Sequence, residues 1–224
     1  MGEATVNEHI DLYCERIGAN LLAEPVNLLT NLSFIIAASI HIRHYFALKV
    51  NNKVNQYSYL YLIILVFLIG IGSSLFHSFA TKWAMLADVI PIGIYLISFL
   101  PIYISVCGDF QSKHTLTLLA YFGFTTFLGS RVPPTLANGS QNYFGALITL
   151  VSLGLLSKIR GHSGFSLLLA AGGALCLSLF FRSIDQLICP ILPLGTHFLW
   201  HIFNGIVLYL TLEFVRIQLR NDNC

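Results

Sequence analysis

Long stretches of this chain contain no Asp, Glu, Lys or Arg, and they are the feature that most limits what the chain can fold into. Three of them carry the argument. They cover residues 54–81, 89–108 and 186–212. A helix needs ~20 mostly apolar residues to cross a bilayer, and each stretch is long enough. Only 10% of the chain is charged, whereas a soluble domain usually carries about 25%. The pattern therefore predicts an integral membrane protein.

The apolar segments predict an all-α fold, a bundle of seven transmembrane helices. We expect one helical domain over residues 26–215, preceded by a polar segment, 1–25, and followed by a short tail, 216–224. The spans are predicted at residues 26–45, 58–77, 86–107, 114–130, 142–157, 164–182 and 196–215.

An odd number of spans places the two termini on opposite sides of the membrane. Cytoplasmic loops carry an excess of Lys and Arg, so the basic residues predict the orientation. An N-terminus outside and a C-terminus inside puts eight of them inside and four outside. The inner set is Arg43, Lys49, Lys53, Lys113, Lys158, Arg160, Arg216 and Arg220, and the outer set is Arg16, Lys82, Arg131 and Arg182.

The same order of spans brings polar residues from distant parts of the chain to one side, that of the acidic N-terminal segment. Ionisable residues at membrane depth are costly, so those that persist usually face the bundle interior and have a function. The residues that converge on this side are Ser73, His77, Asp88, Arg182, Asp185, His197 and His201.

Two of the histidines are spaced for joint binding of a metal ion. His197 and His201 are four residues apart, which places both rings on one face of a helix. His77, at the same depth on another predicted span, is the natural third ligand. Three protein ligands leave a fourth position for water, as in catalytic zinc sites. The pair alone is a weak motif, because Phe198 stands where a soluble metalloprotease helix has Glu.

Two neighbours of this set are candidates for catalysis. Ser73 lies one helical turn before His77, so its hydroxyl could bind a substrate oxygen. Asp88 begins the next span, where a carboxylate could transfer a proton between water and a leaving group. The alternatives are that Ser73 only eases helix packing and that Asp88 pairs with Lys82 or Arg182.

Other polar features are assigned no direct role. The remaining histidines lie in the N-terminal segment, near loops or at the basic end of the first span: His9, His41, His44, His114 and His162. The net charge of +2 is small and dispersed, which argues against a nucleic-acid partner.

Taken together, these residues resemble the alkaline ceramidase family, which belongs to the CREST superfamily of seven-helix membrane hydrolases. The resemblance rests on Ser73-x-x-x-His77, on Asp88 eleven residues later and on His197-x-x-x-His201 in the last span. It extends to the N-terminal segment and to the end of the sixth span, through Tyr13-Cys14-Glu15, Glu24, Asp185 and Cys189.

The resemblance implies an activity and a role for each residue. Zinc would be bound by His77, His197 and His201. Ser73 would polarise the substrate carbonyl, and Asp88 would act as general acid and base. The expected reaction is hydrolysis of the amide bond of ceramide, or of a related lipid amide, to a sphingoid base and a fatty acid. The lipid substrate would enter the apolar bundle from the bilayer.

The resemblance also implies a calcium site in the N-terminal segment, where the family motif has the form Asp-Trp-Cys-Glu-x-Asn followed by a Glu. Glu15 and Glu24 match the motif. Asp11 lies one residue too early for the first ligand, and Asn20 is a substitute for the missing Asn. Calcium needs six or more oxygen ligands. The alternative is an acidic segment that caps the first helix.

The family pattern further implies a disulfide between Cys14 and Cys189. Both cysteines fall on the predicted outer side, where an oxidising compartment would permit the bond. It would tie the N-terminal segment to the connection between the sixth and seventh spans.

Two other functions fit the same residues. One is a hydrolase or remodelling enzyme that acts on acyl esters, and the other is a receptor-like protein with a structural zinc. A structural zinc normally has four protein ligands, and it would need neither Ser73 nor Asp88. The presence of these two residues therefore favours catalysis. No obligate protein partner is evident. The expected location is the inner membrane in a bacterium, or the endoplasmic reticulum or Golgi membrane in a eukaryote.

Overall fold

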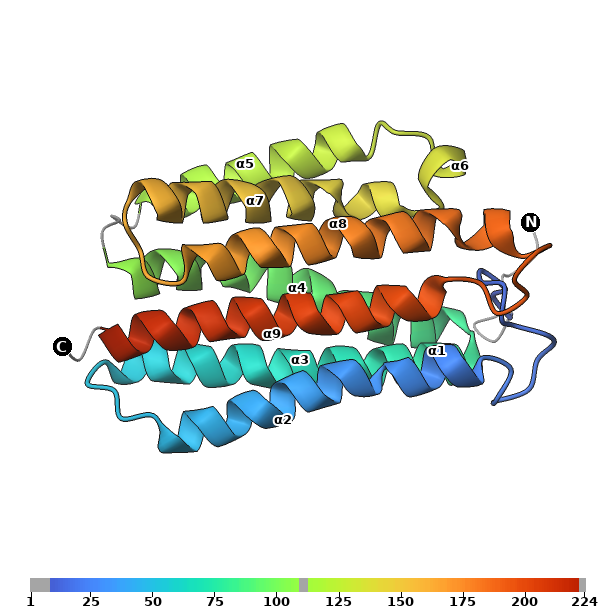
Figure 1. Ribbon diagram of the computed structural model, residues 1–224, viewed down its shortest axis with the longest axis horizontal. Coiled ribbons are helices and arrows are strands. Elements are labelled where there is room, and N and C mark those ends of the chain that lie inside the picture. The colour runs from blue at the N-terminus through green and yellow to red at the C-terminus, as the bar shows by residue number, and fades with distance from the viewer. Residues whose placement is uncertain (1–8, 109–112, 222–224) are drawn as a thin grey trace.

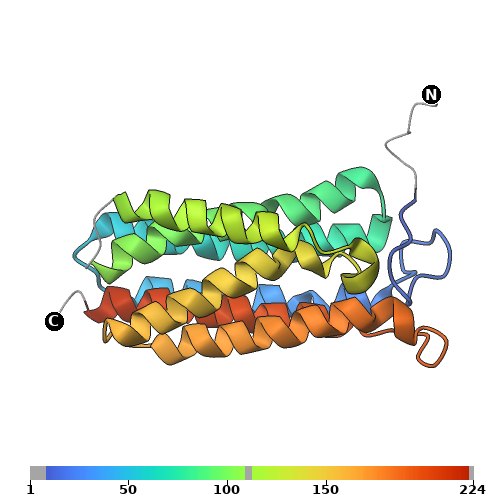
Figure 2. The same cartoon turned by 90° about the horizontal axis from the view of Figure 1, so that it is seen from above.

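The computed structural model describes residues 9–108 and 113–221. The regular structure in these residues is helical. The long helices run along the longest axis of the molecule (Figures 1 and 2). The elements are α1 (Pro25–Thr30), α2 (Leu32–Ala47), α3 (Lys53–Phe79), α4 (Lys82–Cys107), α5 (Lys113–Gly129), α6 (Pro134–Ala137), the 3-10 turn η1 (Ser140–Tyr143), α7 (Phe144–Ile159), α8 (Phe165–Ile188) and α9 (His197–Asn221).

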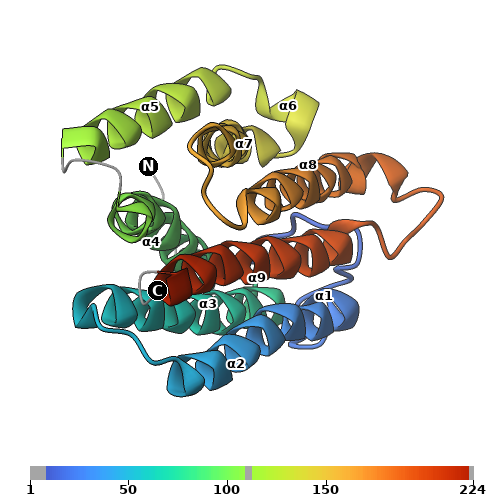
Figure 3. The ribbon, with the colours of Figure 1, turned by 60° about the vertical axis from the view of Figure 1, so that its left-hand side comes forward.

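The predicted helical membrane bundle is confirmed. Within the described residues, six helical segments are long and apolar enough to cross a bilayer, and α1 with α2 counts as one of them. The predicted fourth span corresponds to α5, which has 17 residues and is therefore ~25 Å long. It packs against α7 and α4 at the edge of the bundle (Figure 3).

Several helices extend beyond the spans predicted from apolar residues. The second span starts at Lys53, α8 runs to Ile188, and α9 continues to Asn221, past the predicted end at residue 215. Charged and polar residues at these ends mark where the helix leaves the hydrocarbon, but they do not end the helix. Residues 222–224 of the predicted tail lie outside the described part of the chain.

The last helix, α9, is the centre of the bundle. It packs against α8 on one side and against α2 and α3 on the other, and it also contacts α1 and α4 (Figure 3). Its buried side chains include Leu212, Phe214 and Val215. Because α9 touches helices from both halves of the chain, a residue near its start can meet residues from any of them.

A close approach of α3 and α4 places two of the predicted site residues. A two-residue turn, Ala80 and Thr81, joins the helices. Gly72 on α3 lies against the backbone of Ala87 on α4, so closely that a Cβ on Gly72 would clash with the Ala87 carbonyl. Ser73 and Asp88 are the residues that follow this contact on each helix.

The described part of the N-terminal segment covers one end of the bundle, and Asn221 lies at the opposite end (Figure 1). The amide of Ile10 donates a hydrogen bond to the carbonyl of Ala80, at 2.7 Å. The side chain of Gln186 donates to the carbonyl of Leu12, at 2.6 Å. The segment therefore contacts both the α3–α4 turn and the end of α8. Which end faces outward stays a prediction from the basic residues.

The Gly72 contact predicts a specific packing defect. Gly72→Ala would force α3 and α4 apart, at a cost of about 1–3 kcal/mol, and would lower the melting temperature of the detergent-solubilised protein. Gly93→Ala, on α4, is the matched control, because nothing lies within 4 Å of an added Cβ there. We expect the control to melt at or above the wild-type temperature. Equal melting of the two variants would contradict the contact.

Candidate metal and catalytic site

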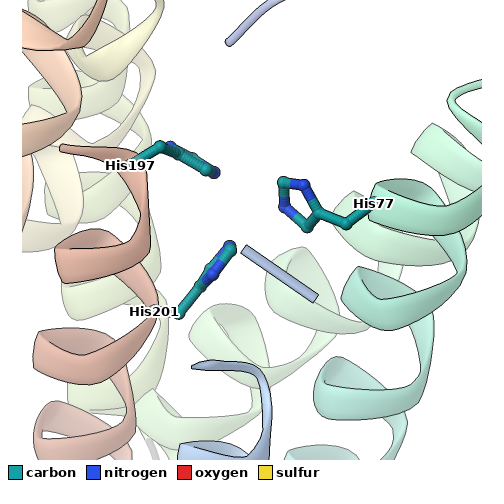
Figure 4. A group of neighbouring side chains, drawn as sticks. All are labelled: His77, His197 and His201. Atoms are coloured by element: carbon teal, nitrogen blue, oxygen red, sulfur yellow. The ribbon is translucent and has the colours of Figure 1, made fainter. Parts of the chain in front are cut away.

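Three histidines converge at the end of the bundle that the N-terminal segment covers. His77 reaches in from the last turn of α3, and His197 and His201 from the first turns of α9, with their rings turned toward one another (Figure 4). One nitrogen from each ring lies within 4.8 Å of the others. All three side chains are buried. The structure thus brings together the ligand set predicted from the sequence.

Their hydrogen bonds leave nitrogens available to a metal ion. His77 Nδ1 bonds to a Glu24 carboxylate oxygen at 2.5 Å, and His201 Nδ1 bonds to Thr30 Oγ1 at 2.9 Å. The Thr30 hydroxyl has one proton and donates it to a backbone carbonyl of α1, so it accepts from His201. Both rings therefore present an unprotonated Nε2.

The unpartnered nitrogens fit a metal site. His77 Nε2, His201 Nε2 and His197 Nδ1 are buried and have no hydrogen-bond partner. Leaving buried polar atoms unpaired costs free energy unless something binds them. Metal-ligating histidines usually donate their other nitrogen to a carboxylate or another oxygen, as His77 and His201 do here. The three residues fit a zinc ion by their number, by their type and by the hydrogen bonds that His77 and His201 make through their other ring nitrogen.

A second histidine group lies at the other end of the bundle and fits a metal less well. His41, His44 and Glu213 are close enough to share an ion. However, His41 Nδ1 bonds to Tyr59 Oη at 2.7 Å, and His41 Nε2 bonds to the carbonyl of Tyr209 at 3.1 Å. Both nitrogens of His41 already have protein partners. Of this group, only His44 Nδ1 is a buried ring nitrogen without a hydrogen-bond partner, whereas each histidine of the first group offers one.

Asp185 fixes the start of the helix that carries two of the ligands. One carboxylate oxygen accepts the backbone N–H groups of Thr196, at 2.6 Å, and of His197, at 2.9 Å. The other oxygen accepts the backbone N–H of Cys14, at 3.1 Å. A carboxylate at a helix N-terminus satisfies the free amides and the helix dipole. Asp185 thereby joins α8, α9 and the N-terminal segment.

The predicted disulfide is present. Cys14 and Cys189 are bonded, with their Cα atoms 5.3 Å apart. The bond holds the preceding residue, Tyr13, against the site. The Tyr13 ring stacks on His197, with 3.5 Å between ring centroids. Burial raises the pKa of Tyr13 to about 12, so the phenol is neutral beside the histidines.

Ser73 and Asp88 lie next to the histidines and to each other. The Ser73 hydroxyl is hydrogen-bonded to the Asp88 carboxylate, and Asp88 lies within electrostatic range of both His77 and Arg182. The two alternatives for these residues, packing for Ser73 and an Arg182 pair for Asp88, are thus compatible with the catalytic arrangement. Neither excludes it.

An elongated apolar cavity leads away from this pair. Ser73, Asp88, Tyr143 and Trp200 line it near the histidines, and Leu100 lines it deeper in the bundle. Asp88 and Leu100 are twelve residues apart on α4, which corresponds to ~18 Å along the helix. The remaining lining is mostly aliphatic and aromatic. A cavity of this shape and polarity suits a lipid chain with its polar group at the histidine end.

The four predicted calcium ligands have different surroundings. Glu15 accepts the backbone N–H groups of Val26 and Asn27, at 2.6 and 2.8 Å, and so caps α1, as the alternative for this segment predicts. Glu24 is bound by its neighbours, whereas Asp11 and Asn20 are exposed. Among the described residues, no group of metal-binding side chains includes Asp11, Glu15 or Glu24.

Glu24 is held as an anion. Burial raises the pKa of Glu24, but the hydrogen bonds that Glu24 accepts from His77 and Asn27, together with the charge of Arg16, outweigh the effect of burial. The pKa of Glu24 therefore lies below its usual range. A negative carboxylate on His77 Nδ1 fixes the ring and makes Nε2 a better ligand.

Sequence reasoning missed three contributors to the site. Thr30 was read as part of an apolar span, Arg16 only as an outer basic residue, and Tyr13 only as a match to a motif. The signal for Thr30 was a hydroxyl three residues after the polar Asn27 within the first helix. Tyr13 and Arg16 carried no comparable signal, since their contacts depend on how the N-terminal segment folds over the bundle.

The Glu24 contact predicts a loss of metal affinity. Glu24→Gln removes the charge that polarises His77, and we expect zinc affinity to fall about 10–100-fold, measured by competition with a chromophoric chelator. Glu213→Gln is the control, because Glu213 belongs to the histidine group at the opposite end. If both variants bind zinc as tightly as the wild type, Glu24 has no role at the metal.

Comparison with known proteins shows the family of this chain. The family model described as Ceramidase matches residues 9–223, which is nearly the whole chain. The comparison with curated proteins gave no match. The match includes the histidines, Ser73, Asp88 and both cysteines of the disulfide. The chain therefore belongs to the Ceramidase family of membrane hydrolases.

Proposed function

We propose that this protein is a zinc-dependent hydrolase within the membrane that cleaves the amide bond of ceramide, or of a closely related lipid amide. The observation that carries the proposal is the position of the three histidines. Their free nitrogens meet beside Ser73 and Asp88, at the polar end of an apolar cavity. Family membership supports a lipid substrate and a hydrolytic reaction.

His77, His197 and His201 would hold the zinc ion. When bound, zinc supplies a Lewis acid that lowers the pKa of water to about 7, so that a nucleophile is available at neutral pH. Among the described residues, the group has three side chains that could bind zinc. A four-coordinate zinc ion held by them would keep its fourth position for water. This open arrangement favours a catalytic over a structural metal.

The chain's own residues would divide the remaining work. Asp88 accepts a proton from the attacking water and gives it to the departing amine, since a carboxylate beside the nucleophile can act first as base and then as acid. With substrate bound, the Ser73 hydroxyl turns its one proton from Asp88 to the carbonyl oxygen, where negative charge develops. The cavity holds the acyl and sphingoid chains and excludes bulk water from them.

Substitutions of Asp88 and Ser73, with the neighbouring Ser74 as control, test these roles. Asp88→Asn should lower kcat about 10²–10⁴-fold, the usual contribution of a general acid–base group, while zinc remains bound. Ser73→Ala should also lower kcat, because its hydroxyl faces Asp88. Ser74→Ala is the matched control, since the Ser74 hydroxyl donates to the Gly70 carbonyl within α3, at 2.7 Å. Fatty-acid release from ceramide, followed by mass spectrometry, is the measurement.

Metal removal tests the same proposal independently. We expect protein stripped of metal with a chelator to lose hydrolysis and to regain it when zinc is restored. His77→Ala should show neither zinc binding nor recovery.

A paired ceramide and acyl-ester substrate separates the alternatives. Cleavage of the ester alone would replace the amidase with an esterase or remodelling enzyme. Retained zinc with no cleavage of either substrate would favour the receptor-like function. The particular membrane in which the protein resides stays a prediction.

A further inference from the structure

A buried arginine lies among the residues that the family motif assigns to calcium. Arg16 directly follows Glu15, and its side chain is only 2% exposed. We propose that the Arg16 guanidinium takes the place of a divalent cation in the N-terminal segment, so that the histidine site is held in position without calcium. The proposal concerns ion binding and positioning, and it stands whether or not ceramide is the substrate.

The acceptors around Arg16 are oxygen atoms of the kind that bind calcium. Its Nε donates to Glu24 Oε1 at 2.5 Å, its Nη2 to the carbonyl of His77 at 2.9 Å, and its Nη1 to the carbonyl of Gly18 at 3.4 Å. Carboxylate and backbone carbonyl oxygens are typical calcium ligands. Here a planar guanidinium with donors on three nitrogens satisfies them.

The remaining carboxylate oxygens of Glu15 and Glu24 are also occupied. Both oxygens of Glu15 accept amides at the start of α1. Glu24 Oε2 accepts from His77 and from the side-chain amide of Asn27, at 2.5 and 3.0 Å. Calcium requires six to eight oxygen ligands. It could gain Glu24 only by displacing Arg16, whose charge is permanent and which would lose its buried ion pair with Glu24.

The contacts of Arg16 reach the metal ligand His77 in two ways. Arg16 binds the His77 carbonyl directly, and it binds the carboxylate that holds the His77 ring. The carbonyl is one of those near the end of α3 that have no partner within the helix. Arg16 is therefore a positioning residue: it fixes the end of α3 and the orientation of Glu24, and through them the ring.

The wild-type protein gives the first test. We expect no calcium binding by direct titration of the full chain in detergent, and the same melting temperature with millimolar calcium as in calcium-free buffer. Zinc content would be checked by elemental mass spectrometry after calcium removal. Saturable calcium binding, or a calcium-dependent rise in melting temperature, would overturn the proposal.

Replacing the arginine gives the second test. Arg16→Met keeps much of the side-chain length but leaves Glu24 without its cation, so we expect a lower melting temperature in calcium-free buffer and partial recovery with calcium. Arg43→Met, at an exposed position of α2, is the control and should show neither effect. Arg16→Lys retains the charge without the three-way contact and should fall between the wild type and Arg16→Met.

Zinc affinity separates positioning from general stability. If Arg16 positions His77, the folded Arg16→Met protein should bind zinc about tenfold more weakly, and Arg16→Lys should recover part of the loss. Should Arg16→Met melt like the wild type and bind zinc equally well, Arg16 would be neither a substitute cation nor a positioning residue.

Discussion

The site depends on one constraint: ionisable groups placed in a water-poor interior must be satisfied by one another. Glu24 shows how the chain meets this constraint. Its carboxylate accepts from Arg16, His77 and Asn27, so one buried anion joins the N-terminal segment, α1 and α3. A buried charge that loses a partner is strongly destabilising. The network therefore fixes the geometry of the histidines more firmly than apolar packing alone would.

The same constraint explains where the polar residues of the candidate site lie. Apolar side chains fill the interior around α9, while Asp185 and Glu15 lie where helices begin or end and accept the backbone amides that are free there. Helix ends supply free hydrogen-bonding groups. A catalytic site that opens both to water and to a lipid-sized cavity is most easily built at such a boundary.

The sequence predicted the helical bundle and the histidine group, because each rests on a pattern that can be seen without coordinates, and the resemblance to the family predicted the disulfide. Long uncharged stretches predict the membrane-spanning helices, and the four-residue spacing of His197 and His201 predicts that both rings lie on one face of a helix. The sequence could not predict the surroundings of these residues. Thr30 orients His201 and Arg16 binds Glu24 only because the first helix and the N-terminal segment fold over α9. Several predicted spans were also shorter than the helices, because hydropathy shows which residues lie in the hydrocarbon of the membrane and not where the last hydrogen-bonded turn of a helix lies.

The bond between Cys14 and Cys189 has a consequence for biogenesis. The two cysteines are separated by 175 positions, so nearly the whole polypeptide must leave the ribosome before they can be joined. His197 and His201 emerge later still. Until α9 inserts, the N-terminal segment has no histidine group to cover, because His77 is its only member in place. Oxidation of the thiols would then report that the chain is made through the end of α8, whereas the histidine group is completed only when α9 has joined the bundle.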